Sequence, residues 1–303
     1  MSAYQSGLII QVCISIMTVV AVFAMTGLAG MFSLGQAAYM AVGAYVTFVL
    51  YRYLDIPYYV TGLLAIMVSI FLAWLIGVPT LKLRRDFFAL LTVGFSQMVV
   101  AVILLFEKYT NGSIGFSKIP RADGLLWVSL LTTTLIIFWI RNLKYSRFGR
   151  MCIALKNDEV AARSFGIDVY KLKLKIYILA SAIAAFAGIL MALRNRVITP
   201  DSFGWASSAE MQIFLFFGGT NSLTGAVLSA SVLKLIPEFL RGINLFGTSL
   251  QEYRTIIYCI MIIIVINFRP QGILGEIEFR TKWIRKLFSR SKNNAVPKSE
   301  NYE

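Results

Sequence analysis

The chain has 303 residues, of which 58% are hydrophobic and only 15% are charged. Soluble domains average roughly 45–50% apolar and about 25% charged residues, so this composition excludes an ordinary soluble domain. No charged residue precedes Arg52, and apolar runs of roughly 20 residues, long enough to cross a bilayer, recur along the chain. We therefore predict an all-α fold, a polytopic membrane helix bundle with about 8–10 embedded helices, some of them broken at glycine.

The formal net charge of +14 is concentrated in three segments, residues 82–85, 141–175 and 269–298. Cytoplasmic loops of membrane proteins carry an excess of Lys and Arg, so these segments are predicted to face the cytoplasm. Basic segments beside a membrane also attract anionic lipid. Membrane topology thus explains the positive charge, which does not require nucleic acid as a partner.

In chain order, the first apolar block covers residues 7–54 and is too long for a single crossing. We expect one helix at residues 7–26, a bend, and a second helix at residues 36–50. Gly27, Gly30 and Gly35 indicate the bend, because glycine loosens a helix. Unwound backbone at membrane depth is tolerated only where protein or a water-filled cavity covers it.

Further helices follow this block. The span at residues 174–193 is rich in alanine, which lets helix backbones approach closely in lipid. A shorter apolar piece, residues 210–217, ends at Gly218 and Gly219. The remaining spans are expected at residues 58–80, 87–106, 125–140, 223–240 and 255–268. We divide the chain into a transmembrane domain, residues 1–275, and a basic cytoplasmic tail, residues 276–303.

The basic loop at residues 141–172 contains the signals of a short helix outside the membrane. Asn157 is a good N-cap, and Asp158 and Glu159 complement the positive end of a helix that starts there. Gly166 suits the left-handed position that ends it. The expected helix of about two turns presents small residues, Ala161 and Ala162, for close contact. Capping signals alone are equally consistent with a surface helix that has no function.

This loop also carries a family resemblance. Its pattern E-x-A-A-x-x-x-G resembles the "EAA" loop of permeases in ATP-binding-cassette importers. Residues 147–167 are similar to the matching loop of branched-chain amino acid permeases of the LivM type. Residues 27–39, 198–203, 237–238 and 269–272 resemble further segments of that family, in the same order. Gln36 stands where the family usually has His, Asn221 replaces an expected glycine, and residues 110–115 match only loosely.

The resemblance implies the permease subunit of an ATP-binding-cassette importer that moves Leu, Ile and Val across the cytoplasmic (inner) membrane. The chain itself is expected to be no enzyme and to bind no cofactor, since it lacks a G-x-x-x-x-G-K-[ST] segment. It has no histidine, so no metal site or catalytic base is expected. The implied partners are a second, homologous permease, two ATPases that bind ATP and Mg²⁺, an extracytoplasmic solute-binding protein and membrane lipid.

The resemblance also assigns roles to residues. The helix that couples to the ATPase would hold Asn157, Asp158, Glu159, Ala161, Ala162 and Gly166. Candidates for the translocation pathway are Gly27, Gly30, Ser33, Gly35, Gln36, Glu210, Gly218, Gly219 and Asn221. Candidates for contact with the binding protein are Arg52, Lys108, Arg194 and Arg196.

Charged residues inside the spans allow two interpretations. Lys234 and Glu238 are spaced i,i+4 and can pair on one helix face. Glu210 is either a pathway residue or a helix cap. The alternative functions that remain open are an importer of urea, short amides or another small polar solute, an ion-coupled secondary transporter, and a purely structural membrane subunit.

Overall fold

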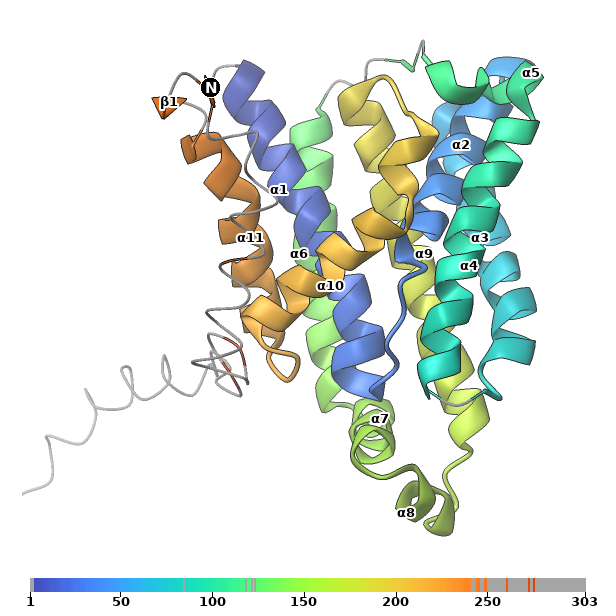
Figure 1. Cartoon of the computed structure of the whole chain (residues 1–303), viewed down its shortest axis with the longest axis vertical. Helices are drawn as coiled ribbons and strands as arrows, with labels where there is room; N and C mark the ends of the chain where they lie inside the picture. The colour runs from blue at the N-terminus through green and yellow to red at the C-terminus, as the bar shows by residue number, and fades with distance from the viewer. Residues whose placement is uncertain are drawn as a thin grey trace, which may run out of the picture.

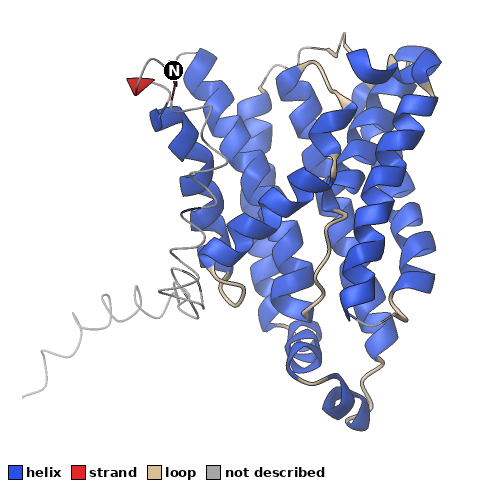
Figure 2. Cartoon of the chain, in the orientation of Figure 1, coloured by secondary structure: helices blue, strands red, loops and turns tan. Residues whose placement is uncertain are grey.

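The computed structural model describes residues 3–83, 85–117, 119–120, 122 and 124–240, with a few short pieces between residues 244 and 275. Helices make up nearly all of this part, and loops are short (Figure 2). After the last long helix, two two-residue strands, β1 (Asn244–Leu245) and β2 (Thr248–Ser249), pair antiparallel. The tail and, apart from Ile260, the helix expected at residues 255–268 lie outside the described residues.

The break expected in the first apolar block is present. Helix α1 (Ala3–Val22) ends in a π-helical turn, Phe23–Leu28, and residues 30–35 form no regular structure before α2 (Gln36–Leu54) begins. At Gly27 an added Cβ would clash with the Phe23 ring and with the carbonyl oxygen of Thr220. Glycine therefore allows the wider π turn and the approach of a distant loop.

Helix α9 (Val169–Asn195) lies in the centre of the bundle and packs against α1, α2 and α3 (Tyr58–Thr80) (Figure 1). Its small residues bring two backbones into contact. A Cβ on Gly188 would meet the Met40 carbonyl, and one on Gly43 would meet the Ala185 carbonyl. The close approach expected from the alanine-rich span is confirmed, and its partner is α2.

The outer helices present apolar side chains to their surroundings. These helices are α3, α4 (Arg85–Leu105) and α6 (Leu125–Tyr145). The most apolar stretch of α9 is 72% buried, whereas that of α6 is only 17% buried. Exposed apolar surface of this extent is unfavourable in water and suits a hydrocarbon environment. Examples of such exposed residues are Leu63, Trp74, Leu90, Trp127 and Leu131.

Helix α10 (Trp205–Gly218) and helix α11 (Leu223–Leu240) form a broken pair, bent by 120°. The turn between them uses Gly219 at φ +108°, while Gly218 lies against the backbone of Gly225. The bounds expected for α11 are confirmed. Helix α10 starts at Trp205 instead of residue 210, with Gly204 at its N-cap. Its polar first turns include Ser208, whose Oγ accepts from Ala37 N of α2 at 2.9 Å.

In the part of the chain that the structure describes, five helices are long and apolar enough to span a membrane, or six if the bent pair is one span. The expectation of 8–10 embedded helices also counted α2, each arm of the bent pair and the undescribed helix near the C-terminus. The all-α, polytopic architecture is confirmed.

The bundle has two distinct ends (Figure 1). At one end, α7 (Arg147–Asn157) and α8 (Glu159–Ser164) project beyond the long helices. At the opposite end lie the short helix α5 (Glu107–Thr110) and the C-terminus of α9. The sequence indicated α8, but it gave no indication of α7, whose N-cap is Ser146, with its Oγ accepting from Gly149 N.

Candidate functional site

Helix α8 is capped by Asp158. Its Oδ1 accepts hydrogen bonds from Val160 N at 2.8 Å and Ala161 N at 3.1 Å. The expected N-cap, Asn157, is instead the last residue of α7, so that prediction was one residue early. Asp158 has extended backbone angles and is the single residue between the two helices, so only its side chain reaches the free N–H groups. Gly166 has φ +77°, as expected for the residue that ends this helix.

Glu159 fastens α8 to the bundle. Its Oε1 accepts from Arg163 Nη2 at 2.7 Å, and its Oε2 accepts from Lys173 Nζ of α9 at 2.8 Å. Partial burial would raise the pKa of Glu159, but the hydrogen bonds and charges of Lys173 and Arg163 outweigh it and hold the pKa below its usual range. Because Lys173 is only 11% exposed, this ion pair is a short, shielded link between α8 and a central span.

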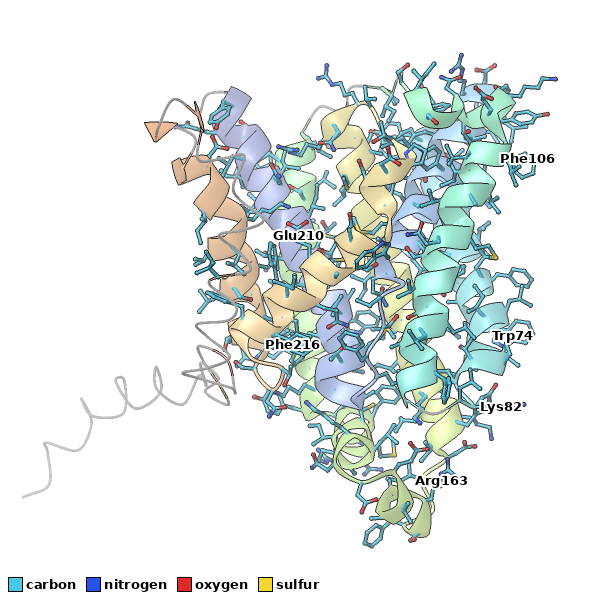
Figure 3. The ribbon with its side chains drawn as sticks, viewed as in Figure 1. Trp74, Lys82, Phe106, Arg163, Glu210 and Phe216 are labelled. Atoms are coloured by element: carbon cyan, nitrogen blue, oxygen red, sulfur yellow. The ribbon has the colours of Figure 1, made fainter. Side chains whose placement is uncertain are left out.

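The free face of α8 differs from the expected one. Ala162 is buried inside the chain, and Ala161 is half-buried. The side chains that project are apolar and large: Val160 is 75% exposed and Phe165 is 86% exposed. Figure 3 shows Arg163 at the same tip of the molecule. The large exposed apolar side chains available to a partner are thus Val160 and Phe165, whereas Ala162 is not accessible.

Lys156 of α7 joins this tip to two breaks in the bundle, the one after α1 and the turn between α10 and α11. Its Nζ donates to the Gly27 carbonyl at 2.9 Å and to Asn221 Oδ1 at 2.6 Å. Lys144 Nζ donates to the Asn221 carbonyl at 2.6 Å. Gly30, with φ +68°, leaves room for the Lys156 side chain. Burial, and the charge of Lys144, lower the pKa of Lys156. Three of the predicted pathway residues therefore meet at one lysine.

A buried polar cluster holds the break after α1 in place. Gln212 of α10 donates through Nε2 to Thr26 Oγ1 at 3.0 Å and to the Ser33 carbonyl at 2.9 Å. Gln36 is 1% exposed, with Nε2 on the Met25 sulfur, and among the described residues its Oε1 has no hydrogen-bond partner. Other predicted pathway residues are also buried in this packing: Gly27, Ser33, Gly35, Gly218 and Gly219. Thr26 and Gln212 were missed, although both are polar residues within apolar runs.

Glu210 lies elsewhere, beside a cavity of about 130 Å³ between α1, α2, α9, α10 and α11. Figure 3 shows it at mid-height of the bundle, between α1 and α10. Its Oε1 lies 3.2 Å from Nζ of Lys234 on α11. Glu210 is the sixth residue of α10, so it is no helix cap, and Lys234 has a partner that the i,i+4 spacing with Glu238 did not suggest.

The four cations expected at the opposite end have different environments. Arg194 joins α9 to α1 by donating to the Gly7 carbonyl at 2.8 Å and to Gln11 Oε1 at 2.7 Å, and it lines the cavity. The Arg52 guanidinium lies 5.5 Å from the centre of the Phe116 ring. The side chains of Lys108 and Arg196 are exposed.

Comparison with known proteins places the chain in a family. The sequence profile described as "Branched-chain amino acid transport system / permease component" matches residues 4–266. The chain belongs to this family. As a member with several exposed apolar helices, it is a multi-pass membrane protein.

Two curated relatives within the family are LivM permease proteins of high-affinity branched-chain amino acid transport systems. The one from Salmonella typhimurium is 30% identical over 281 residues, and the one from Escherichia coli K12 is 29% identical. Each match covers 82% of this chain and 64% of the relative, so the chain spans less than two thirds of their length. The LivH permease protein of Salmonella typhimurium is 27% identical over 190 residues, which cover 62% of this chain and 59% of LivH.

Among solved structures, PsaBC from Streptococcus pneumoniae in complex with Fab has a similar fold. The TM-score is 0.52 at 17% identity, with 89% of this chain and 93% of the other chain covered. This similarity concerns the fold alone.

Proposed function

We propose that this chain is the permease subunit of an ATP-binding-cassette importer that moves branched-chain amino acids across the cytoplasmic membrane. The observation that carries the proposal is α8: a short helix outside the bundle, with two exposed apolar side chains and a shielded ionic link to α9. Membership of the permease family supports the same function. The C-terminal tail and the end with α7 and α8 then face the cytoplasm, as their basic residues favour.

In this function, α8 is the helix that docks onto an ATPase. Val160 and Phe165 fit a groove of the partner, while Glu159 and Lys173 transmit its displacement to α9. Lys156 carries the same displacement from α7 to the break after α1 and to the turn between α10 and α11. Each link is short and charged, so the tip and the broken helices move together.

The remaining partners follow from the same proposal. Two ATPases bind ATP and Mg²⁺, and this chain binds no cofactor. A second permease completes the pathway, in keeping with the LivM and LivH relatives. A solute-binding protein docks at the opposite end, where Lys108 and Arg196 are exposed and Arg52 lies over Phe116. Membrane lipid covers α3, α4 and α6.

The experiment compares two equally exposed apolar residues at opposite ends of the bundle. Phe165→Asp, at the C-cap of α8, is expected to abolish copurification of the ATPase and ATP-driven leucine uptake into vesicles, because it places a charge in an apolar contact. Ile114→Asp, at a residue that is 84% exposed near α5, should leave the ATPase bound. Full ATPase binding and uptake by Phe165→Asp would refute docking through α8.

A further inference from the structure

The cavity beside Glu210 has the composition of a ligand site. Its wall includes three charged side chains, Glu210, Lys234 and Arg194, and apolar side chains such as Met40, Met191 and Met211. At about 130 Å³ it is far smaller than the roughly 300–1,000 Å³ pockets that hold drug-sized ligands, so its occupant is small. We infer that this cavity binds the zwitterion of a free aliphatic α-amino acid during transport. The inference rests on the proposed function and names its substrate site within this chain.

The charges of the cavity match a zwitterion. An ammonium group is attracted to Glu210, and a carboxylate is attracted to Lys234 and Arg194. The pair Glu210–Lys234 joins two arms of the bent pair at 3.2 Å, and its side chains are 40% and 25% exposed, so the cavity reaches both. Charged groups at membrane depth are costly, and an open, partly solvated pair there indicates a function beyond packing.

Arg194 is held in place before any ligand arrives. Its Nε donates to the Gly7 carbonyl, and its two terminal nitrogens donate to Asn195 Oδ1 and Gln11 Oε1, at 2.7 to 2.8 Å. Arg194 therefore contributes a fixed positive field at the cavity wall. The contact between Lys234 Nζ and Glu210 Oε1, at 3.2 Å, is longer than the hydrogen bonds of Arg194, so Lys234 can exchange Glu210 for a ligand carboxylate. A fixed cation beside an exchangeable ion pair favours a ligand with both charges.

The apolar wall accounts for the ligand's side chain. Met40, Met191 and Met211 are unbranched and adaptable, and Ile14 and Phe214 complete the apolar side of the cavity. Such a wall accepts leucine, isoleucine and valine without a shape specific for one of them. Urea and short amides carry no charged group that could pair with Glu210, Lys234 or Arg194, and they have no large apolar portion to contact the methionines. The cavity therefore favours an amino acid over these solutes.

The position of the cavity suits delivery from the end opposite α8. Arg194 and Asn195 are at the C-terminus of α9, whose N-terminus lies at the α8 end. The cavity is also lined by Ser202, just before α10, and by Ser207 in its first turn. The site thus extends from the α5 half of the bundle to mid-height, where Glu210 lies (Figure 3). On the side toward α8, Gln212 is hydrogen-bonded to Thr26 and Ser33, and all three residues are buried.

The test uses the complete importer in proteoliposomes, with leucine-loaded binding protein. Glu210→Gln and Lys234→Met should each lower leucine uptake about tenfold to a hundredfold, the effect of losing one charged hydrogen bond, while ATP hydrolysis without binding protein is retained. Lys171→Met, which removes the exposed ion pair with Asp168 outside the cavity, should transport normally. If both cavity variants import leucine with the wild-type concentration dependence, the inference is wrong although the wild type is still a leucine importer.

The exchanged pair, Glu210→Lys with Lys234→Glu, separates binding from packing. It preserves an ion pair between α10 and α11 but places both charges on the wrong sides relative to Arg194. We expect this variant to assemble and to remain inactive, whereas restored uptake would mean that the pair is only structural. A wild-type importer that moves no leucine at all would instead contradict the proposed function.

A competition measurement identifies the chemical class directly. Tritiated leucine binding to the assembled importer, without binding protein, should be displaced by valine and isoleucine. Leucinamide, which lacks the carboxylate, and 4-methylpentanoate, which lacks the ammonium group, should compete at least about tenfold more weakly. Equal competition by either analogue, or by urea, would overturn recognition of a zwitterion.

Discussion

At the scale of single residues, Lys156 joins distant parts of the chain. Its ammonium group binds the Gly27 carbonyl and the Asn221 side chain, which belong to two different breaks in the bundle. A hydrogen bond that involves a charged group contributes about 1.5–3 kcal/mol, and more is lost where a buried partner stays unsatisfied. These two bonds therefore contribute to stability, and in the proposed function they transmit motion from α7.

Lys156→Met tests this role. The methionine keeps most of the length of the side chain but leaves the Gly27 carbonyl and Asn221 Oδ1 without this donor. We expect a lower melting temperature and a lower number of leucine molecules transported per ATP hydrolysed, with the ATPase still bound through α8. An unchanged ratio would show that Lys156 serves stability alone.

Glu159 provides a prediction that depends on pH. Its pKa is lowered in the folded chain, so its ion pairs contribute stability above the pKa of an unfolded Glu, about 4.3, and lose that contribution as the pH falls through the lower folded value. Glu159→Gln should therefore lower the unfolding free energy by about 1 kcal/mol at pH 7 and have a progressively smaller effect as the pH falls below about 4.3. Melting temperatures of both proteins across this range measure the difference, and a constant difference would contradict the ionic link.

At the scale of elements, the pair α2 and α9 depends on backbone contact. Gly43 and Gly188 place each helix against a carbonyl of the other, at Ala185 and Met40. In lipid, helices associate through such close packing and not through burial of apolar surface from water. A side chain at either glycine forces the central helix away from its neighbour.

Gly188→Val should consequently destabilise the bundle by about 3 kcal/mol or more, the upper range for overpacked interiors. Gly94→Val is the matched control, because Gly94 is exposed in the middle of α4 and an added Cβ there meets nothing within 4 Å. Both proteins are compared by size-exclusion profile and melting temperature in detergent. Equal behaviour of the two variants would mean that α2 and α9 can separate without loss.

At the scale of the whole molecule, the two ends face different compartments in the proposed function. Phe165 lies at one tip and Ile114 at the other, and each is more than four-fifths exposed. Cys152 of α7, by contrast, is buried, and burial raises the pKa of its thiol to about 12, so little reactive thiolate is present at neutral pH.

A membrane-impermeant maleimide tests this orientation. With Cys259 changed to Ser, Phe165→Cys should be labelled only in inside-out vesicles and Ile114→Cys only in right-side-out vesicles. The parent protein, with Cys13 and Cys152 both buried, should remain unlabelled in each. The reverse pattern would place α8 outside the cell and would exclude contact with a cytoplasmic ATPase.

The sequence by itself determined the features that depend on neighbouring residues. Apolar length predicted the spans, and the bounds of α11 were right, because crossing a bilayer requires a continuous apolar segment. Glycine predicted the breaks near Gly27 and Gly218 and the end of α8 at Gly166. The positive φ of Gly166 is a local demand, whereas the close approach at Gly27 involves the distant Thr220 carbonyl. The capping residue of α8 was misplaced by one position, since Asn157 and Asp158 have similar intrinsic preferences.

Only the tertiary structure decided which distant residues meet. Lys234 and Glu210 are 24 positions apart, and Lys156 and Gly27 are 129 apart, so no periodicity within one helix relates them. The same holds for Arg194, which was a candidate for contact with the binding protein: it is bound to α1 and lines the cavity. A long side chain finds its partner through the packing of whole helices, and that packing depends on the shapes of all their faces at once.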